Sequence, residues 1–266
     1  MKKNKRQRVA IVIPIYEAQP HQDEISVLKY FLKLFHKYPI VFMKKEGLDV
    51  GVYQTAIDEV KHPSIIFEEF SWNGYLGYNR LMVEKTFYKR FLHYEYILIA
   101  HLDAFAFSDD LEDWCNKGYD YVGSVIHNIP FVEDYIKTSR LLRWLQKKNY
   151  LKVSDFQNGG FSLRKVTAFY RSCSFYGPLI KRSNLVYSED FFWSVRLPQM
   201  NPFFRVAPES TARSFSIELP KENDENFVSV RDSVQSLPFG CHGWKKHGYS
   251  FWKPILEKNM QTKLSD

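Results

Sequence analysis

The sequence predicts an α/β fold in which helices cover a mostly parallel central sheet. Two observations support this prediction. Short apolar runs alternate with segments whose apolar residues recur at helical spacing, which is typical of strand–helix–strand units. The longest run, Tyr96–Phe107, is apolar at nearly every position, as in a strand that is covered on both faces. The pattern is less regular in the second half of the chain.

In the first half, strands and helices are expected to alternate. Pro14 is expected to end the ladder of the first strand, because proline lacks the N–H that a ladder needs. The predicted strands are Val9–Tyr16, Pro39–Met43, Ser64–Phe67 and Tyr96–Phe107, and the two clearest helices are Glu24–Lys37 and Gly74–Tyr94.

The second half is predicted to hold shorter elements. We expect a strand at Gly118–Ser124, a basic helix at Tyr135–Tyr150, a helix that ends near Cys173, a helix that begins at Ser188, a polar loop at Leu219–Asp232 and a glycine-punctuated loop at Pro238–Trp244. One domain is expected over residues 9–255. A disordered basic tail, 1–8, would precede it and a C-terminal tail, 256–266, would follow it.

Composition narrows the class of partner. The net charge is +7 and the pI is about 9.1, which favours nucleotide phosphates, nucleic acid or an acidic membrane surface. No apolar stretch reaches the length of a membrane span, and the run after the basic tail is too short for a secretory signal. The three scattered cysteines, an odd number without a C-x-x-C pair, favour neither a disulfide framework nor a cysteine-based zinc site. The expected compartment is the cytoplasm.

Asp103 is the first candidate for a functional residue. It is a lone acid near the C-terminal end of a predicted buried strand, where open α/β sheets bind their ligands. A carboxylate in that place needs a compensating partner. His101 lies two residues earlier, on the same face of a strand. The alternative is an ordinary strand-end aspartate that caps the next turn.

Two further segments are candidate phosphate or ligand contacts. Arg80 falls on the apolar face of the predicted helix near its start, where a phosphate contact and a snorkelling or core-paired arginine are equally compatible with the pattern. Gly159 and Gly160, after Asn158, let the backbone approach a ligand closely, although a plain tight turn explains them as well.

The remaining candidates lie in the last third of the chain. Glu189 and Asp190 follow Ser188, so they are either first-turn acids of a capped helix or a general base. His242 lies in a glycine-punctuated loop from which it could reach a metal or a phosphate. Trp244 is suited either to stacking on a sugar or to the core.

No P-loop, H-E-x-x-H, G-x-S-x-G or G-x-G-x-x-G is present. The order of the other segments, from about residue 9 to 252, resembles a glycosyltransferase of the GT-A type. More closely, it resembles an uncharacterised, mainly bacterial glycosyltransferase-like family with the order LDAF…NGGFSLR…ED…HGW. The resemblance implies a GT-A-like, Rossmann-like fold, with a nucleotide-binding half at 9–107 and a sugar and acceptor half at 108–255.

The resemblance also implies roles for individual residues. The implied donor-binding residues are Pro14, Tyr16, Glu17, Arg80, Asp103, Asn158, Gly159, Gly160, His242 and Trp244. Glu189 and Asp190 match the acidic pair near the acceptor, and Asp190 is the favoured base if the reaction inverts the anomeric centre. If the centre is retained, these acids would orient the sugar.

The family's Asp-x-Asp metal motif is incomplete here, because Asp103-Ala-Phe105 lacks the second acid. Asp103, His242 and the donor diphosphate would hold Mn²⁺ or Mg²⁺ in one alternative. In the other, Arg80 and other cations replace the metal.

The implied function is transfer of a sugar from a nucleoside-diphosphate sugar to a glycan or lipid-linked glycan, in bacterial surface polysaccharide synthesis. The basic stretch Tyr135–Lys152 is the candidate for acceptor recognition and for peripheral contact with a membrane surface, unless it is an ordinary solvated helix. Two other functions compete: a noncatalytic nucleotide-sugar or glycan binder, and a nucleic-acid binder. The acidic segments 109–113 and 222–225 interrupt the basic stripe that a nucleic-acid binder would need.

Overall fold

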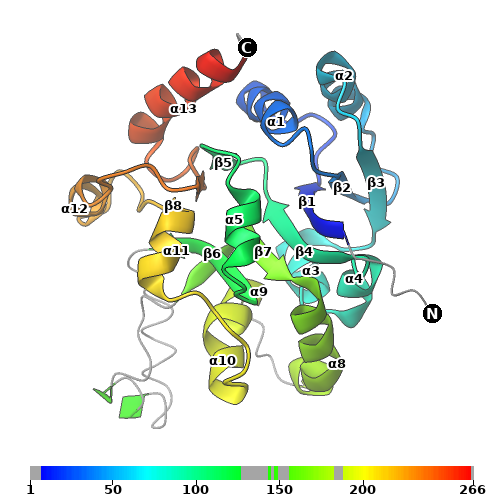
Figure 1. Ribbon diagram of the computed structural model, residues 1–266, viewed down its shortest axis with the longest axis vertical. Helices are drawn as coiled ribbons and strands as arrows, with labels where there is room; N and C mark the ends of the chain where they lie inside the picture. The colour runs from blue at the N-terminus through cyan, green and yellow to red at the C-terminus, as the bar shows by residue number, and fades with distance from the viewer. Residues whose placement is uncertain (1–6, 127–142, 145–146, 149–155, 183–187, 265–266) are drawn as a thin grey trace.

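A computed structural model of the chain describes residues 7–126, 143–144, 147–148, 156–182 and 188–264. Within these residues the predicted α/β fold is confirmed: a nine-stranded, mostly parallel sheet is covered by helices on both faces (Figure 1). The strand order is β3-β2-β1-β4-β7-β6-β8-β9-β5. The strands are β1 Gln7–Ile15, β2 Ile40–Lys45, β3 Ile65–Phe70, β4 Tyr94–Ala100, β5 Ala104–Ala106, β6 Tyr121–Ile126, β7 Gln157–Lys165, β8 Ser216–Glu218 and β9 Gly240–His242.

The sheet combines a parallel half with a mixed half. β1 pairs in parallel with β2 and β4, and β2 pairs in parallel with β3. β7 then lies antiparallel between β4 and β6, while β8 is parallel to both β6 and β9. The short β5 is antiparallel to β9. This order brings the turn after β4 next to the C-terminal strand β9, although the two are far apart in the sequence.

Helices from both halves of the chain form the two outer layers. They are α1 Gln22–Leu34, α2 Gly51–Val60, α3 Gly74–Leu81, α4 Lys85–Arg90, α5 Leu111–Asn116, α8 Val166–Arg182, α9 Glu189–Phe191, the π-helix Phe192–Arg196, α10 Leu197–Met200, α11 Glu209–Phe215, α12 Phe227–Asp232 and α13 Tyr249–Leu264. One apolar core lies between the sheet and α1, α2, α5, α11 and α13. A second lies between the sheet and α3, α4, α8 and the π-helix. Both faces of the sheet are therefore buried, as its continuous apolar strands predict.

The first strand differs from the prediction at both ends. It begins at Gln7, within the segment expected to be a disordered tail. Pro14 does not end the ladder, because Pro14 and Ile15 still pair with Met43 and Lys44 of β2. Pairing with β4 stops at Val12, so the residue that lacks an N–H stands beyond the β4 ladder.

The helix expected at Gly74–Tyr94 is broken into α3 and α4. The break follows Leu81, and the carbonyl of Met82 accepts hydrogen bonds from the Tyr88 hydroxyl, at 2.8 Å, and from Nε1 of Trp193, at 3.2 Å. These contacts use the carbonyl that a continuous helix would have bonded internally. Because of the break, residues of α3 such as Arg80 no longer share a face with the apolar residues of α4.

The predicted strand at Tyr96–Phe107 is also interrupted. β4 ends at Ala100, and a turn closed by the Ala104 N–H to His101 carbonyl bond separates it from β5. Asp103 therefore lies in a turn at the carboxyl end of β4 rather than inside a strand. The expectation that it stands near His101 holds for a different reason, because the turn, not strand alternation, brings the two together.

Three predictions for the C-terminal half are corrected. The polar loop at Leu219–Asp232 ends in a helix, α12. The expected loop at Pro238–Trp244 contains β9, which the sheet includes because its backbone pairs with β5 and β8. The expected tail at 256–266 is helical through Leu264, since Trp252 and Leu256 of α13 are buried in the first core.

The basic stretch Tyr135–Lys152 lies outside the described residues except for 143–144 and 147–148. Its proposed part in acceptor recognition therefore remains a prediction. Among the described residues, no helix is both long and apolar enough to cross a bilayer.

Candidate active site

A cluster of three potential metal ligands lies at the carboxyl end of β4. One ligand atom from each of His101, Asp103 and His242 lies within 4.8 Å of the other two. Nε2 of His242 is 3.4 Å from Oδ1 of Asp103, and the rings of His101 and His242 meet edge to face at 5.7 Å. Two of the three, Asp103 and His242, are residues that the sequence proposes as ligands.

The backbone explains why residues 140 positions apart meet. Ala104 of β5 pairs with His242 of β9, so the strand after the turn holds the imidazole against it. The amide of Trp244 bonds the carbonyl of Asp103 at 3.4 Å. His101 N–H donates to the carbonyl of Gly160 at 2.8 Å, which ties the turn to β7 as well. The cluster is thus held by β4, β7 and β9 together.

The charges within the cluster depend strongly on one another. Burial alone would lower the pKa of His242, but the carboxylates of Asp103 and Glu218 outweigh it and raise the pKa to about 10. Burial would raise the pKa of Asp103, yet the charges of His242 and nearby Lys246 hold it well below its usual range. Burial, with the charge of His242, lowers the pKa of His101 to about 4. The cluster therefore holds an ionised carboxylate and one neutral imidazole.

Each imidazole of the cluster has an outer partner. Nδ1 of His242 is 2.6 Å from Oε2 of Glu218, and the other oxygen of Glu218 is 3.6 Å from Nε2 of His247. Nε2 of His101 is 2.9 Å from the hydroxyl of Tyr78 in α3. Outer partners of this kind orient imidazole ligands in metal sites.

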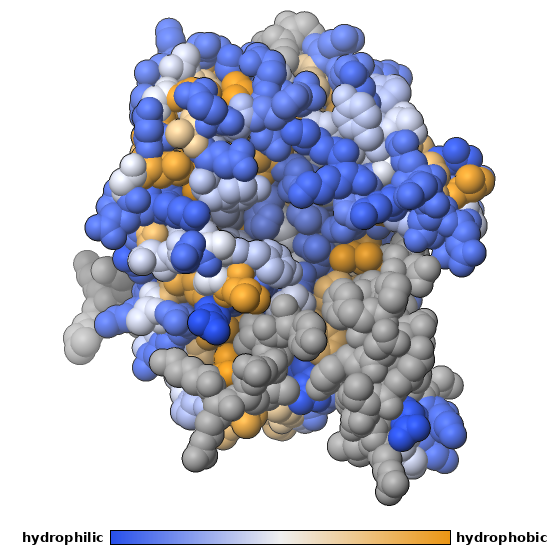
Figure 2. All heavy atoms as spheres, turned by 180° about the vertical axis from the view of Figure 1, so that it is seen from behind, coloured by the Kyte–Doolittle hydropathy of each residue, from blue (hydrophilic) through white to orange (hydrophobic). Residues whose placement is uncertain are grey.

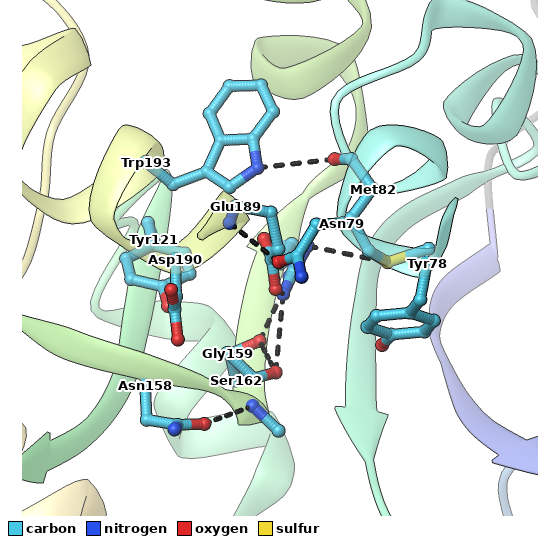
Figure 3. A network of polar contacts seen from close by, with 12 residues as sticks. Tyr78, Asn79, Met82, Tyr121, Asn158, Gly159, Ser162, Glu189, Asp190 and Trp193 are labelled. Atoms are coloured by element: carbon cyan, nitrogen blue, oxygen red, sulfur yellow. Dashed lines mark hydrogen bonds and ion pairs between the residues drawn. The ribbon is translucent and has the colours of Figure 1, made fainter. Parts of the chain in front are cut away.

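A second polar group lies on the other side of Tyr78, and Figure 3 shows it. Arg164 of β7 is fully buried and pairs with Oε1 of Glu189 at 2.8 Å. It also donates to the hydroxyls of Ser162 and Tyr88, at 2.9 and 3.0 Å, and to the carbonyl of Gly159, at 3.2 Å. A buried guanidinium needs this many partners to offset its desolvation.

Asp190 stands beside this ion pair without joining it. Figure 3 shows Glu189 and Asp190 pointing side by side toward the segment that holds Asn158 and Gly159. Oδ1 of Asp190 accepts the N–H of Phe191 at 2.9 Å. Burial nevertheless raises the pKa of Asp190. A carboxylate with a raised pKa and no cation bound to it is suited to accept a proton.

The histidine cluster and the Arg164–Glu189 pair both pack against a bulge in β7. Gly123 of β6 pairs with Ser162 while the next residue, Ser124, pairs with Asn158, so the residues between Asn158 and Ser162 have no partner in β6. A side chain on Gly159 would overlap the Glu189–Arg164 pair, and one on Gly160 would overlap the imidazole of His242. The two glycines are therefore needed for close approach, as the sequence predicts, although what approaches them here is protein.

Helix α3 connects the acid pair with the histidine cluster. Oδ1 of Asn79 accepts the N–H of Glu189 at 2.9 Å, one residue after Tyr78 reaches His101. In Figure 1, α3 and α9 lie behind the sheet, and Figure 2 shows the molecule from that side. The visible face is mostly hydrophilic and is hollowed near its centre. Polar groups from both halves of the chain thus meet on one side of the sheet.

Three other predicted donor-binding residues, Pro14, Tyr16 and Glu17, lie near the end of β1. Tyr16 and Glu17 follow β1, and about half of the Tyr16 side chain is exposed. Desolvation of its other half and the charge of Asp103 raise the pKa of Tyr16 to about 12, so Tyr16 lies near the cluster. Pro14 is buried within β1. Tyr16 and Glu17 remain candidates for contact with a ligand.

Two expectations do not match the structure. Arg80 is exposed, and the buried residue at that turn of α3 is Asn79, because the break after Leu81 alters the phase that placed Arg80 inward. Trp244 is 3% exposed and stacks on Tyr249 with ring centroids 6.1 Å apart, so it belongs to the core rather than to a sugar platform.

Sequence reasoning missed two residues of these networks. Arg164 is the last residue of the segment NGGFSLR, and strand alternation from Ser162 would have placed it on the same buried face. Glu218 offers no comparable signal, because it ends a three-residue strand inside a segment without a clear period.

The donor set of the cluster fits a divalent transition metal. Nε2 of His242 is buried and makes no hydrogen bond among the described residues, and its neighbour there is Oδ1 of Asp103 at 3.4 Å, so a cation bound between the two would satisfy both atoms. Two imidazoles and one carboxylate suit a divalent first-row transition metal better than Mg²⁺, which prefers oxygen ligands. His101 and Asp103, two residues apart, offer two of the three potential ligands of the cluster.

The fold is shared with solved glycosyltransferases. Mouse xyloside xylosyltransferase 1, in its apo form, is 12% identical with a TM-score of 0.57, and the match covers 89% of this chain and 97% of that one. The bifunctional glycosyltransferase WbbM is 14% identical with a TM-score of 0.55, covering 91% of this chain and 46% of WbbM. GlyE of Streptococcus pneumoniae TIGR4 is 10% identical with a TM-score of 0.52, covering 89% and 54%. This chain spans about half the length of the last two, and identities this low establish the fold alone.

No curated protein matches the sequence. A protein family does, over residues 64–242, which include β4, the histidine cluster, the glycine bulge and the acid pair. The chain belongs to the family described as Protein of unknown function (DUF5672).

Proposed function

We propose that this protein is a glycosyltransferase that moves a sugar from a nucleoside-diphosphate sugar to a hydroxyl of a glycan or lipid-linked glycan. The observation that carries the proposal is the cluster of His101, Asp103 and His242 at the carboxyl end of β4, with the acid pair joined to it through α3. In open α/β sheets this edge is where ligands bind. The shared fold with glycosyltransferases supports the same reaction class.

The cluster is proposed to bind the donor diphosphate. A divalent metal held by His101, Asp103 and His242 would neutralise charge on the departing diphosphate. Lys246 is exposed and close enough to act on the pKa of Asp103, so we assign it as a second cation for the phosphates. Arg80 is exposed on α3 instead of facing the sheet, and its contact with the phosphates stays a prediction.

The two acids are proposed to have different roles. Glu189 is bound to Arg164, and its position depends on that pair. Asp190 carries no such cation, and we assign it as the base for an inverting transfer. The acceptor oxygen would bond to the anomeric carbon as its proton passes to Asp190, while the bond from that carbon to the diphosphate oxygen breaks.

The main competing function is a noncatalytic binder of nucleotide sugars, suggested by the missing second acid of Asp-x-Asp. His101 makes this alternative weaker, because it supplies a ligand two residues before Asp103. We also assign the acceptor to bacterial surface polysaccharides. The support is the order of the sequence segments, which resembles a mainly bacterial glycosyltransferase-like family.

A nucleotide-sugar panel tests the proposal. With Mn²⁺ present, the wild-type protein should release nucleoside diphosphate from one or a few donors, faster when an acceptor glycan is added. Asp190→Asn should lower this rate by at least about a hundredfold, since general-base catalysis typically contributes that much. Asp232→Asn, an exposed acid paired with Arg231, should leave it within about twofold.

The outcomes separate the alternatives. Specific donor binding without any turnover would identify a noncatalytic binder. Full activity in Asp190→Asn would remove Asp190 from the mechanism.

A further inference from the structure

Glu218 contacts both histidines of the C-terminal segment. Its carboxylate is 2.6 Å from Nδ1 of His242 and 3.6 Å from Nε2 of His247, and its side chain is 8% exposed. A buried carboxylate is costly unless it is paired or hydrogen-bonded, and the two imidazoles supply these partners.

The fold holds this carboxylate in place. β8, which ends at Glu218, pairs in parallel with β9, with Ile217 opposite Cys241, the residue before His242. Gly243 has φ +66°, and a side chain there would crowd His247 and contact Glu218. The turn after β9 therefore folds back onto the carboxylate.

The contact decides which nitrogen of His242 faces the cluster. Because Nδ1 is engaged by Glu218, only Nε2 remains for a ligand, and Nε2 is the atom that faces Asp103 at 3.4 Å without a hydrogen bond. Two adjacent strands thus turn Nε2, the ring nitrogen that Glu218 does not engage, toward the other two ligand side chains.

We infer that Glu218 is a positioning residue for metal binding. It accepts the Nδ1–H hydrogen bond that fixes the tautomer and ring orientation in which Nε2 of His242 binds a divalent transition metal together with His101 and Asp103. The inference rests on the proposed function, which assigns a metal to this cluster. Carboxylates that accept from ligating histidines raise the basicity of the ligand and commonly contribute ten- to a hundredfold in metal affinity.

Tyr78 offers an internal comparison. Its hydroxyl contacts Nε2 of His101 at 2.9 Å, as Glu218 contacts His242. A phenol is neutral, so it orients its histidine without adding charge. Tyr78→Phe should therefore weaken metal binding less than loss of Glu218 does.

Metal titration of the full chain tests the inference. Mn²⁺ is titrated by calorimetry, and Co²⁺ by the visible absorption that reports its ligands. Glu218→Gln keeps the shape and an acceptor oxygen but removes the charge, and it should raise the metal Kd by about tenfold. Glu218→Ala removes both and should raise it by up to about a hundredfold. The control is Glu222→Gln, an exposed acid bonded to the amide of Ser250, which should leave the Kd unchanged.

The readouts separate failure of the inference from failure of the proposed function. If wild type binds neither ion, the metal role in the proposed function fails. If wild type binds and Glu218→Gln binds equally well, the inference is overturned while the metal site stands. If the alanine variant does not fold, the ¹⁵N signals of the His242 ring in the wild-type protein still show which nitrogen binds the metal. Addition of Zn²⁺ should shift the ¹⁵N signal of Nε2 and leave Nδ1 protonated. A metal-dependent shift of the Nδ1 signal instead would contradict the proposed tautomer.

Discussion

At the scale of single residues, the two adjacent glycines of β7 carry separate constraints. Gly159 leaves room for the Glu189–Arg164 pair, and Gly160 leaves room for the imidazole of His242. Neither has a positive φ, so the requirement is close approach rather than an unusual backbone conformation.

Gly160→Ala should therefore abolish or greatly weaken metal binding. The added methyl group would overlap the imidazole of His242 and force the ring away from Asp103. Calorimetric titration with Mn²⁺ measures the effect. The matched control is Gly177→Ala in α8, where nothing lies within 4 Å of the new methyl group and the exchange should stabilise the helix by ~0.5–1 kcal/mol. Unchanged metal affinity in Gly160→Ala would show that the ring is not confined there.

The pH dependence of turnover should report the raised pKa of Asp190. A base must be ionised to accept a proton, so the rate falls as the pH drops through its pKa. Because burial raises that pKa, the acid limb of kcat should lie above pH 3.8, the ordinary value for aspartate. A kcat profile at saturating metal and donor measures it. A limb at or below the ordinary value would argue against Asp190 as the base.

The sequence predicted several of these residues but not their partners. Asp103 could be selected because it is a lone acid at the end of a predicted buried strand, and His242, Glu189 and Asp190 because their side chains can bind a metal or accept a proton. Glu218 could not, since its importance depends on the pairing of β8 with β9, a contact that no local pattern encodes.

At the scale of secondary-structure elements, Arg164 connects β7 with α9 and α4. Its guanidinium bonds Glu189 at the start of α9, Tyr88 in α4 and the bulge in its own strand. The side chain of Arg164 is 0% exposed and that of Glu189 is 5% exposed, so solvent screens this ion pair little.

Arg164→Met should destabilise the protein by about 3–5 kcal/mol, because it leaves the buried Glu189 without its counter-ion. Urea unfolding measures the loss. The double variant with Glu189→Met should recover part of it, since both charges are then absent. Arg231→Met, which removes an exposed pair with Asp232, should change stability by less than about 1 kcal/mol. A single variant as stable as wild type would mean that water reaches the pair.

Element prediction failed where distant groups compete for the backbone. The apolar face of Gly74–Tyr94 continues across the break, so periodicity alone favours one helix. The carbonyl of Met82 instead accepts from Tyr88 and Trp193, and the second of these lies more than a hundred residues away. That single break is also why Arg80 was placed on the wrong face.

At the scale of the whole molecule, the parallel half of the sheet was predicted, whereas in the mixed half only β6 was, as the strand expected at Gly118–Ser124. Strands β1 to β4 are long and apolar, so their pattern is clear. β5, β8 and β9 have three residues each, which is too short for any period to be detected. Their placement depends on pairing with one another.

Metal should stabilise the folded chain by mass action. Mn²⁺ at a hundred times its Kd should add ~2.7 kcal/mol to the free energy of unfolding, with a smaller effect from Mg²⁺ at the same concentration. A thermal melt with and without a chelator measures the shift. Asp103→Asn should reduce it, whereas Asp58→Asn on the exposed face of α2 should not. A melting temperature that is unchanged by both Mn²⁺ and Mg²⁺ would exclude a metal from the cluster.

The bulge in β7 has a consequence for motion during catalysis. Gly159 touches the carboxylate side of the proposed reaction centre and Gly160 touches the phosphate side, so one peptide unit of about 3.8 Å separates the two. A covalent spacer of that kind cannot lengthen or shorten when a substrate arrives. Covalent geometry therefore fixes the spacing between the two backbone positions that pack against Glu189 and His242.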